Sequence, residues 1–256
     1  DIKPTILVSS SLTEKGYKMY TLDNLNSKVK YSWDSYPTYS AYLQMMNDFS
    51  SNYPSLCETI EIGTTVENRK LLLCKLTSNN NLNSKSRVLL TSSMHGDETT
   101  GYVLMLRLID YLLTNYNTDN RIKNILDNTE VWICPLANPD GTFAGGNNSV
   151  WGSTRYNGNN KDLNRNYKDD VFGDHPDNNS WQPETIAFMN LVTENVFTIG
   201  VNIHGGTEVC NYLWDNKSTD FVDKQWWIDV CREYADTCHV YNSNYIYVSY
   251  NSCIIF

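Results

Sequence analysis

The stretch Arg87–Leu113 reads RVLLTSSMHGDETTGYVLMLRLIDYLL and decides the fold class. It begins with a short apolar run, Arg87–Ser92, of the kind that forms buried strands in parallel sheets. It ends in Gly101–Leu113, whose apolar residues recur at helical spacing and predict an amphipathic helix. His95 and Glu98 lie in the connection between the two. The stretch therefore predicts a strand–loop–helix unit that carries two chemically active side chains just beyond its strand.

The same alternation of strand and helix patterns continues on both sides of this unit. Further strands are predicted at Thr59–Gly63, Lys70–Thr77, Glu130–Leu136 and Phe197–His204, and further helices at Tyr39–Phe49, Pro183–Glu194 and Thr219–Cys238. This order predicts an α/β fold, a single domain whose mixed, mostly parallel central sheet has helices on both faces. We expect residues 1–35 to form a polar N-terminal segment and residues 36–256 to form the domain. In such folds, ligands bind beyond the carboxyl ends of the strands.

Composition narrows the class of partner and the cellular setting. The 256 residues carry a formal charge of -9, which argues against nucleic acid or an anionic membrane as partner. The chain has no run of about 18 apolar residues, so no transmembrane helix is expected. Its first residues do not resemble a signal peptide, and we expect any export signal to have been removed already. The seven cysteines are odd in number and form no C-x-x-C pair, which favours free buried thiols over a disulfide framework.

Three residues have the composition of a catalytic metal site. His95 and Glu98 are three residues apart after one buried strand, and His204 ends another. Two histidines and one carboxylate leave one tetrahedral position for water or substrate, as in a catalytic zinc site. Taken alone, His95 and Glu98 also fit an ordinary polar loop, and His204 also fits a hydrogen-bonded core histidine. We expect no metal role for the two remaining histidines, His175 and His239.

The segments between these ligands resemble a known family. In chain order, the motifs are SSMHGDETTG, NPDG, WGSTR at Trp151–Arg155, DLNRNY at Asp162–Tyr167, QPETIA at Gln182–Ala187 and NIHGGTEVCNYLWD. Together they resemble the M14 family of zinc carboxypeptidases, and most closely its regulatory branch, which includes carboxypeptidases E, N and D. The resemblance runs from about Tyr36 to about Asp215. It implies a secreted metalloprotease that removes residues from peptide C-termini with one zinc ion per chain, held by His95, Glu98 and His204.

The resemblance also implies roles for four further residues. Arg155 matches the arginine that polarises the scissile carbonyl and stabilises the oxyanion. Asn164 and Arg165 match the pair that holds the substrate's terminal carboxylate, a task that suits the planar fork of arginine. Asp215 matches an aspartate that favours Lys or Arg at the substrate's end, although an exposed aspartate after a strand is an equal alternative.

Three other polar residues lie within these motifs. Asp140 is either a partner that orients a ligand histidine or a plain turn residue. Asp162 and Asn166 are expected to shape their loop and to take no part in catalysis.

The general base of the family has no match in this sequence. The resemblance places a glutamate base and a lid tyrosine beyond the third ligand, where the glutamates of this chain are Glu208 and Glu233. Neither fits the family pattern, and the closing segment YNSNYIYVSYNSCIIF does not resemble the family's end. We expect the natural product to be longer. An intact variant without the base, or a different local carboxylate, are the alternatives.

Two other functions stay open. The chain can be a pseudoenzyme that holds zinc and a peptide C-terminus without cleavage. It can also be a hydrolase of peptidoglycan stem peptides or of N-acyl amino acids with the same fold. The expected partner is a peptide or protein C-terminus, the expected state is a monomer, and the expected location is extracellular or periplasmic. Cobalt or another divalent ion also suits the same ligands.

Overall fold

The structure, a computed structural model, describes residues 18–20, 31, 33–80, 84–206, 209–212 and 222–241. The described residues up to Gly205 belong to one compact unit, and those from Gly206 onward belong to a second. All three predicted metal ligands lie in the first unit. The domain boundaries expected from the sequence stay a prediction.

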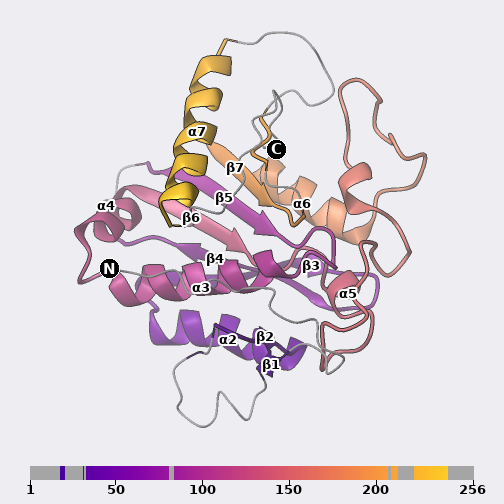
Figure 1. Cartoon of the computed structure of the whole chain (residues 1–256), viewed down its shortest axis with the longest axis horizontal. Coiled ribbons are helices and arrows are strands. Elements are labelled where there is room, and N and C mark those ends of the chain that lie inside the picture. The colour runs from indigo at the N-terminus through magenta and orange to yellow at the C-terminus, as the bar shows by residue number, and fades with distance from the viewer. Residues whose placement is uncertain are drawn as a thin grey trace. The chain divides into compact units, whose positions relative to one another are not determined.

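A five-stranded sheet forms the centre of the first unit (Figure 1). Its strands, in spatial order, are β3 (Cys57–Thr64), β4 (Lys70–Leu76), β6 (Thr129–Cys134), β5 (Ser86–Ser92) and β7 (Ile199–Ile203). β4 runs antiparallel to both of its neighbours, whereas β5 runs parallel to β6 and β7. Four of the five strands therefore point in one direction, which confirms the predicted mixed, mostly parallel sheet. Two short strands, β1 (Met19–Tyr20) and β2 (Tyr36–Pro37), form a separate parallel pair.

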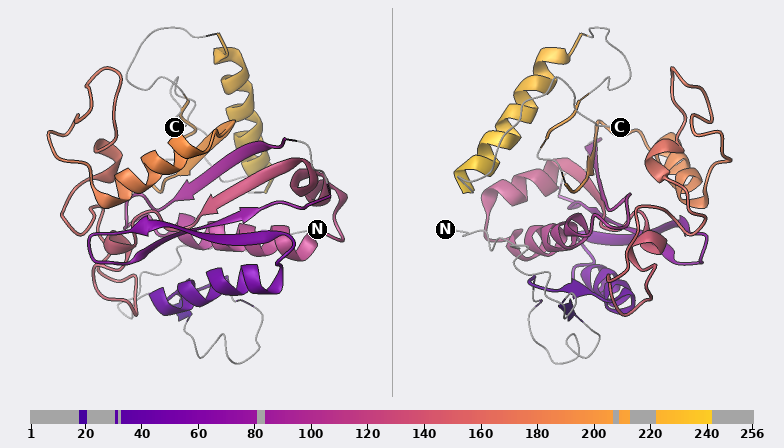
Figure 2. Two further views of the ribbon diagram at one scale, coloured as in Figure 1. Left: turned by 180° about the vertical axis from the view of Figure 1, so that it is seen from behind. Right: turned by 45° about the vertical axis from the view of Figure 1, so that its right-hand side comes forward.

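Helices cover both faces of this sheet, as predicted (Figures 1 and 2). On one face lie α2 (Tyr39–Asn52) and α3 (Thr100–Asn115), and on the other lies α6 (Pro183–Glu194). A fourth helix, α4 (Asn120–Asn128), connects α3 to β6.

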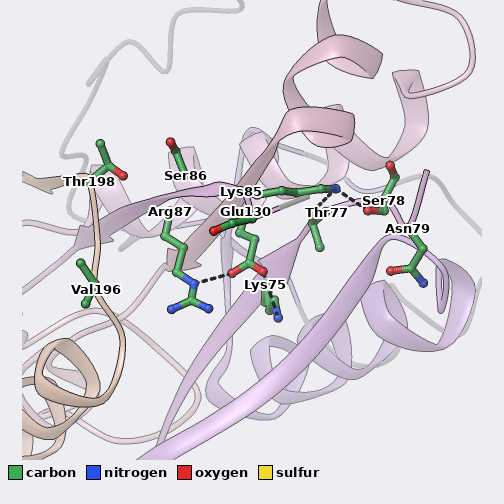
Figure 3. A pocket seen from close by; sticks show the side chains of 11 residues that line it. Lys75, Thr77, Ser78, Asn79, Lys85, Ser86, Arg87, Glu130, Val196 and Thr198 are labelled. Carbon is green, nitrogen blue, oxygen red and sulfur yellow. Dashed lines mark hydrogen bonds and ion pairs between the residues drawn. The ribbon is translucent and has the colours of Figure 1, made fainter. Parts of the chain in front are cut away.

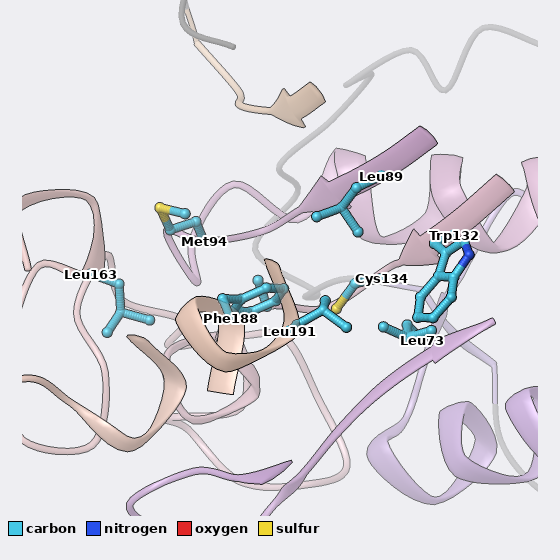
Figure 4. Packing of buried hydrophobic residues seen from close by; sticks show 9 residues of the cluster. Leu73, Leu89, Met94, Trp132, Cys134, Leu163, Phe188 and Leu191 are labelled. Atoms are coloured by element: carbon cyan, nitrogen blue, oxygen red, sulfur yellow. The ribbon is translucent and has the colours of Figure 1, made fainter. Parts of the chain in front are cut away.

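The strand β4 shows why its sequence, KLLLCKL, is apolar without alternation. Neighbouring residues of a strand point to opposite faces, and here both faces are covered. Cys74 lies 3.9 Å from the sulfur of Met46 on the α2 side. Leu73 belongs to the cluster on the α6 side that includes Leu191 (Figure 4). Burying each such leucine contributes about 1.5–3 kcal/mol to the free energy of unfolding.

One glycine sets how closely the start of α3 packs against the end of β5. A Cβ atom at Gly101 would lie 2.8 Å from the Cβ atom of Ser92. The side chains of Tyr102, Leu106 and Ile109 are fully buried, so α3 presents an apolar face to the core. The short connection that carries His95 and Glu98 is therefore held between two well-packed elements.

The second unit contains α7 (Lys224–Tyr241), close to the predicted helix. Within this unit, buried Tyr212 and Cys231 pack with Trp227. Six cysteines lie among the described residues, all as free thiols; four of them are buried, and Cys210 and Cys238 are partly exposed. No helix in the described part of the chain has the length and apolar character needed to cross a membrane.

Candidate metal centre

The topology of the sheet brings the three predicted metal ligands to one edge. His95 and Glu98 lie in the connection between β5 and α3, and His204 directly follows β7. Because β5 and β7 are adjacent and parallel, with Ser92 paired to Ile203, their carboxyl ends lie side by side. Residues far apart in the sequence therefore meet at the edge where ligands bind in such sheets.

The Glu98 carboxylate lies between the two histidines. Its Oε1 atom is 2.8 Å from Nδ1 of His95, and its Oε2 atom is 2.8 Å from Nδ1 of His204. The backbone N–H of Gly205 also donates to Oε2, at 3.0 Å. The ligand atoms of the three residues all lie within 4.8 Å of one another. The predicted ligands thus converge.

These contacts determine the protonation of the cluster. Partial burial alone raises the pKa of Glu98, but the hydrogen bonds from His204, His95 and Gly205 outweigh burial and hold that pKa well below its ordinary value. Burial alone lowers the pKa of His95, but its contacts with Asp162 and Glu98 outweigh burial and raise that pKa. An imidazole nitrogen binds a metal only when it carries no proton, so metal binding at these residues would compete with their protonation.

The donor set fits a catalytic zinc ion. Both Nδ1 atoms face the same carboxylate, so two imidazole nitrogens and a carboxylate oxygen point toward a common position. These are ordinary ligand types for zinc, and three protein ligands leave a coordination position for water or substrate. His95 is buried and the other two ligands are partly exposed, so solvent reaches one side of the cluster.

Asp162 has a larger role than the loop-shaping one expected from the sequence. Its Oδ1 atom lies 3.2 Å from Nε2 of His95. Its Oδ2 atom accepts a hydrogen bond from Arg155 Nε at 2.9 Å and forms an ion pair with Nη2 at 2.8 Å. Burial raises the pKa of Asp162, but His95 and Arg155 outweigh burial and lower the pKa to about 2. A carboxylate on the far nitrogen of a ligand histidine fixes the orientation of that ring.

Asp140 has its hydrogen-bond partners away from the ligand histidines, so the orienting role expected for it is wrong, and it is more than a plain turn residue. It lies in the short helix α5 (Pro139–Thr142) and is fully buried. Its carboxylate accepts hydrogen bonds from Thr65 Oγ1 at 2.7 Å, Glu67 N at 2.9 Å and Arg69 Nη1 at 2.8 Å. Asp140 therefore anchors α5 to the turn between β3 and β4 through a buried ion pair, which sequence spacing did not reveal.

The same segment supports the ligand loop. Asn138 Nδ2 donates to the carbonyl oxygen of Met94 at 3.1 Å. A Cβ atom at Gly96 would lie only 2.2 Å from the carbonyl carbon of Gly141. The glycine of the His-Gly-x-Glu motif is thus required because the loop packs directly against the backbone of α5.

Arg155, the predicted catalytic residue, lies beside a candidate ligand, and the predicted substrate-binding residues Asn164 and Arg165 are linked to it through Asp162. Arg155 Nη1 is 3.2 Å from Nδ1 of His95. Asn164 and Arg165 lie in the 3-10 helix η1 (Leu163–Arg165), whose first turn is capped by Asp162 through a 2.9 Å hydrogen bond to Asn164 N. Asp162 therefore connects Arg155, His95 and η1 in one network.

The structure describes some of the remaining predicted residues and not others. Asn166 is buried and accepts hydrogen bonds from Gln182 N and Thr185 Oγ1, a loop-shaping role as expected. The ring of His175 lies 5.0 Å from that of Trp181. Asp215 and Glu208 lie outside the described residues.

A separate cavity of about 560 Å³ lies at the opposite ends of the strands (Figure 3). Ser86 at the start of β5 and Thr198 just before β7 contribute to its lining, together with Lys75, Lys85 and Glu130. None of the candidate metal ligands lines this cavity, so it is not part of the metal centre.

Comparison with known proteins agrees with this geometry. The family model described as zinc carboxypeptidase matches residues 42–254. Carboxypeptidase D of Rattus norvegicus is 35% identical over 173 residues, which are 66% of this chain and 12% of that protein. Carboxypeptidase M of Mus musculus is 37% identical over 174 residues, which are 67% of this chain and 39% of that protein. The chain thus spans well under half the length of these curated relatives.

Solved structures share the fold. The crystal structure of thrombin-activatable fibrinolysis inhibitor is similar with a TM-score of 0.74 and 18% identity, over 84% of this chain and 58% of that one. Carboxypeptidase A from Helicoverpa armigera is similar with a TM-score of 0.67 and 20% identity, also over 84% of this chain and 58% of that one. At these identities, the likeness supports the architecture of the sheet and helices.

Proposed function

Since the chain belongs to the M14 family of zinc carboxypeptidases, we propose that it is a zinc-dependent hydrolase that removes residues from the C-terminus of peptides or proteins. We propose one zinc ion per chain, held by His95, Glu98 and His204. The observation that carries the proposal is the convergence of these three side chains at the carboxyl ends of β5 and β7.

Arg155 is the residue best placed to stabilise the reacting carbonyl. The bound zinc would supply Lewis-acid polarisation and a water of lowered pKa. Arg155 lies beside His95, and Asp162 holds its guanidinium from one side. The guanidinium is partly exposed, so it can donate to a carbonyl oxygen as negative charge develops there.

Arg165 and Asn164 are proposed to bind the free carboxylate of the substrate. Arg165 is exposed, and its Nη1 atom donates to the carbonyl oxygen of Asn164 at 2.7 Å. This hydrogen bond orients the guanidinium of Arg165. The other N–H groups of Arg165 can still donate to both oxygens of a carboxylate. Asn164 and Arg165 closely follow Asp162 in the sequence, and Asp162 contacts His95. This supports a position for both residues near the metal centre.

Preference for Lys or Arg at the substrate's end is a further part of the proposal. It rests on Asp215, whose charge would attract a cationic side chain in a partly desolvated pocket. We assign no general base. Glu208 lies outside the described residues, and Glu233 lies on α7 in the second unit.

We further propose that the protein is a monomer and acts in an extracellular or periplasmic setting. We propose no nucleic acid or membrane partner. The formal charge of -9 supports the absence of polyanionic partners.

Three peptides that differ only at their C-terminus test the function. We expect the zinc-loaded protein to release Lys from a peptide with a free C-terminal Lys and to leave the amidated form intact. A peptide ending in Phe should be cleaved more slowly. Peptide binding with about one zinc per chain and no cleavage would instead support the binding-only alternative. Cleavage of an N-acyl amino acid or a peptidoglycan stem peptide in preference to all three would support the other hydrolase.

A further inference from the structure

The cavity at the start of β5 carries an excess of positive charge. Among the described residues that line it, one is acidic, Glu130, and three are cationic, Lys75, Lys85 and Arg87. The whole chain has the opposite balance, with a formal charge of -9. A concave site with cations on its walls concentrates anions locally. The excess therefore indicates an anionic ligand at this place, although the chain as a whole is acidic.

Arg87 has hydrogen-bond donors that its partner does not use. Its Nε atom donates to Oε2 of Glu130 at 2.8 Å, which fixes the direction of the side chain. Its two terminal nitrogens form no hydrogen bond with any residue that the structure describes, and 36% of the side chain is exposed. These two nitrogens form one planar edge of the guanidinium. Such an edge can donate two parallel hydrogen bonds to one oxyanion.

Lys75 supplies a second cation beside Arg87. Its Nζ atom lies 3.6 Å from Oε1 of Glu130 and 5.4 Å from the ring centre of Trp132. Figure 3 shows both cations beside the single carboxylate of Glu130. One carboxylate balances only one of these two positive charges. An oxyanion bound by Lys75 and Arg87 would balance the other.

The third cation, Lys85, has neutral partners. Its Nζ atom donates to the hydroxyl of Thr77 at 2.9 Å and to two backbone carbonyl oxygens. These bonds hold the ammonium group in place, but none of these partners carries a charge. The nearby carboxylate of Asp127, which accepts a hydrogen bond from Ser78, forms an ion pair with Lys123 at 2.7 Å. Lys85 therefore adds a fixed positive charge to the cavity.

The size and lining of the cavity limit the ligand to a small polar molecule. Its volume of about 560 Å³ lies within the range of ordinary ligand pockets. Exposed Ser86 and Thr198 add hydroxyl groups to its wall, and Val196 is the one apolar residue among the described residues that line it. Such a wall suits a hydrated anion better than an apolar ligand.

We propose that this cavity binds a small molecule through a phosphate or sulfate group, held directly by Arg87 and Lys75 and attracted by the fixed charge of Lys85. The group would lie where β5 begins, whereas His95 and Glu98 follow the end of the same strand. The inference goes beyond the proposed function and does not depend on it, because none of the candidate metal ligands lines the cavity.

NMR of the arginine side-chain N–H groups, with inorganic phosphate added to the full chain, tests the site. We expect phosphate to shift the signal of Arg87, which is identified by its loss in Arg87→Gln. Sulfate at the same ionic strength should do the same. Acetate should bind about tenfold more weakly, because it carries a single charge.

Three variants show whether the binding depends on the cavity. Lys75→Gln should raise the phosphate concentration that half-saturates the Arg87 signal by about tenfold, because a charge-assisted hydrogen bond is lost. The matched control Lys168→Gln removes an equal charge from an exposed lysine outside the cavity and should leave that concentration near the parent value. Glu130→Gln should lower it several-fold, since glutamine keeps an acceptor for Arg87 Nε but has no charge that competes with the anion.

The possible outcomes separate this site from general surface charge and from the metal centre. An Arg87 signal that neither ion moves would overturn the inference, and so would equal effects of Lys75→Gln and Lys168→Gln. Shifts confined to the signals of Arg155 and Arg165 would place the anion at the metal centre and contradict the proposal. Acetate that binds as tightly as phosphate and sulfate would contradict the assignment to these two groups. No part of this test requires bound zinc, so its failure and that of the proposed function are distinguishable.

Discussion

At the scale of single residues, the sequence predicted three candidate ligands that lie close together in the structure, but it did not predict the residues that contact them. His95, Glu98 and His204 belong to motifs that the family resemblance identifies. Asp162 was expected only to shape its loop, yet it contacts both His95 and Arg155. Its position depends on how its loop folds back to His95, and sequence spacing carries no such information. The one available signal was its place two residues before Asn164.

Asp162→Asn tests this support. The change keeps the shape of the side chain but removes the charge that orients His95 and Arg155. We expect zinc affinity to fall by about 10–100-fold. At saturating zinc, we expect kcat to fall more than KM rises, since Arg155 acts on charge that develops during the reaction. Chelator competition and steady-state kinetics measure the two effects.

The matched control is Asp97→Asn, which removes an equal charge from the exposed residue beside the ligands. It should leave zinc affinity and kcat near the parent values. If Asp162→Asn had the same zinc affinity and kcat as this control, the contacts of Asp162 with His95 and Arg155 would have no role in zinc binding or catalysis.

At the scale of elements, strong periodic patterns predicted strands and helices to within a few residues. The helix α6 was predicted with its observed bounds, and β7 begins two residues later than expected because pairing with β5 starts at Ile199. The helix α4 was missed, although Asp119 caps its start and Ile122 and Leu126 are buried four residues apart. Its nine residues are too few for periodicity alone to reveal.

The contact between the ligand loop and α5 predicts a severe effect of a small substitution. Gly96→Ala would place a Cβ atom 2.2 Å from the backbone of Gly141, which cannot give way as a flexible side chain would. We expect a loss of about 1–3 kcal/mol in the free energy of unfolding, measured in urea with a chelator present. We also expect weaker zinc binding, because His95 must move.

The exposed neighbour Asp97, changed to Ala, provides the comparison. It adds no atom near α5 and should unfold at nearly the parent urea concentration. Equal stability of the two variants would contradict the close packing of the loop.

Glu130 links three strands and predicts a dependence of stability on pH. Its Oε2 atom accepts from Arg87 Nε at 2.8 Å, and its Oε1 atom lies 3.6 Å from Lys75 Nζ. Burial alone raises the pKa of Glu130, but its contacts with Arg87, Trp132 and Lys75 outweigh burial and lower the pKa below its ordinary value of 4.5. The folded-state pKa lies below the unfolded one. The ionised Glu130 therefore makes its full contribution to the free energy of unfolding when the pH is above that ordinary value. The contribution is lost as the pH falls through the folded-state pKa.

Glu130→Gln should accordingly lower the free energy of unfolding by about 1 kcal/mol at neutral pH. The difference from the parent should shrink as the medium is made more acidic than pH 4.5, the ordinary value for this group. Urea unfolding at neutral and acid pH measures both values, with the exposed Glu194→Gln as control. A difference that stays constant into acid would show that charge at Glu130 does not stabilise the sheet.

At the scale of the whole molecule, the class of sheet could be predicted but the order of its strands could not. β6 lies between β4 and β5, although it follows both in the sequence. That order places β5 beside β7 and so brings His204 to His95 and Glu98. Pattern alone predicted that each ligand follows a strand, and the family resemblance implied only that the three residues hold one zinc ion.

The central claim is that these three ligands bind one zinc ion, and elemental analysis of the dialysed full chain tests it most directly. We predict about one zinc per chain for the parent and for Asp97→Asn, and much less than one for Glu98→Gln, which loses the charge that lies between the two histidines. No zinc in the parent after reconstitution, or full zinc content in Glu98→Gln, would contradict the account.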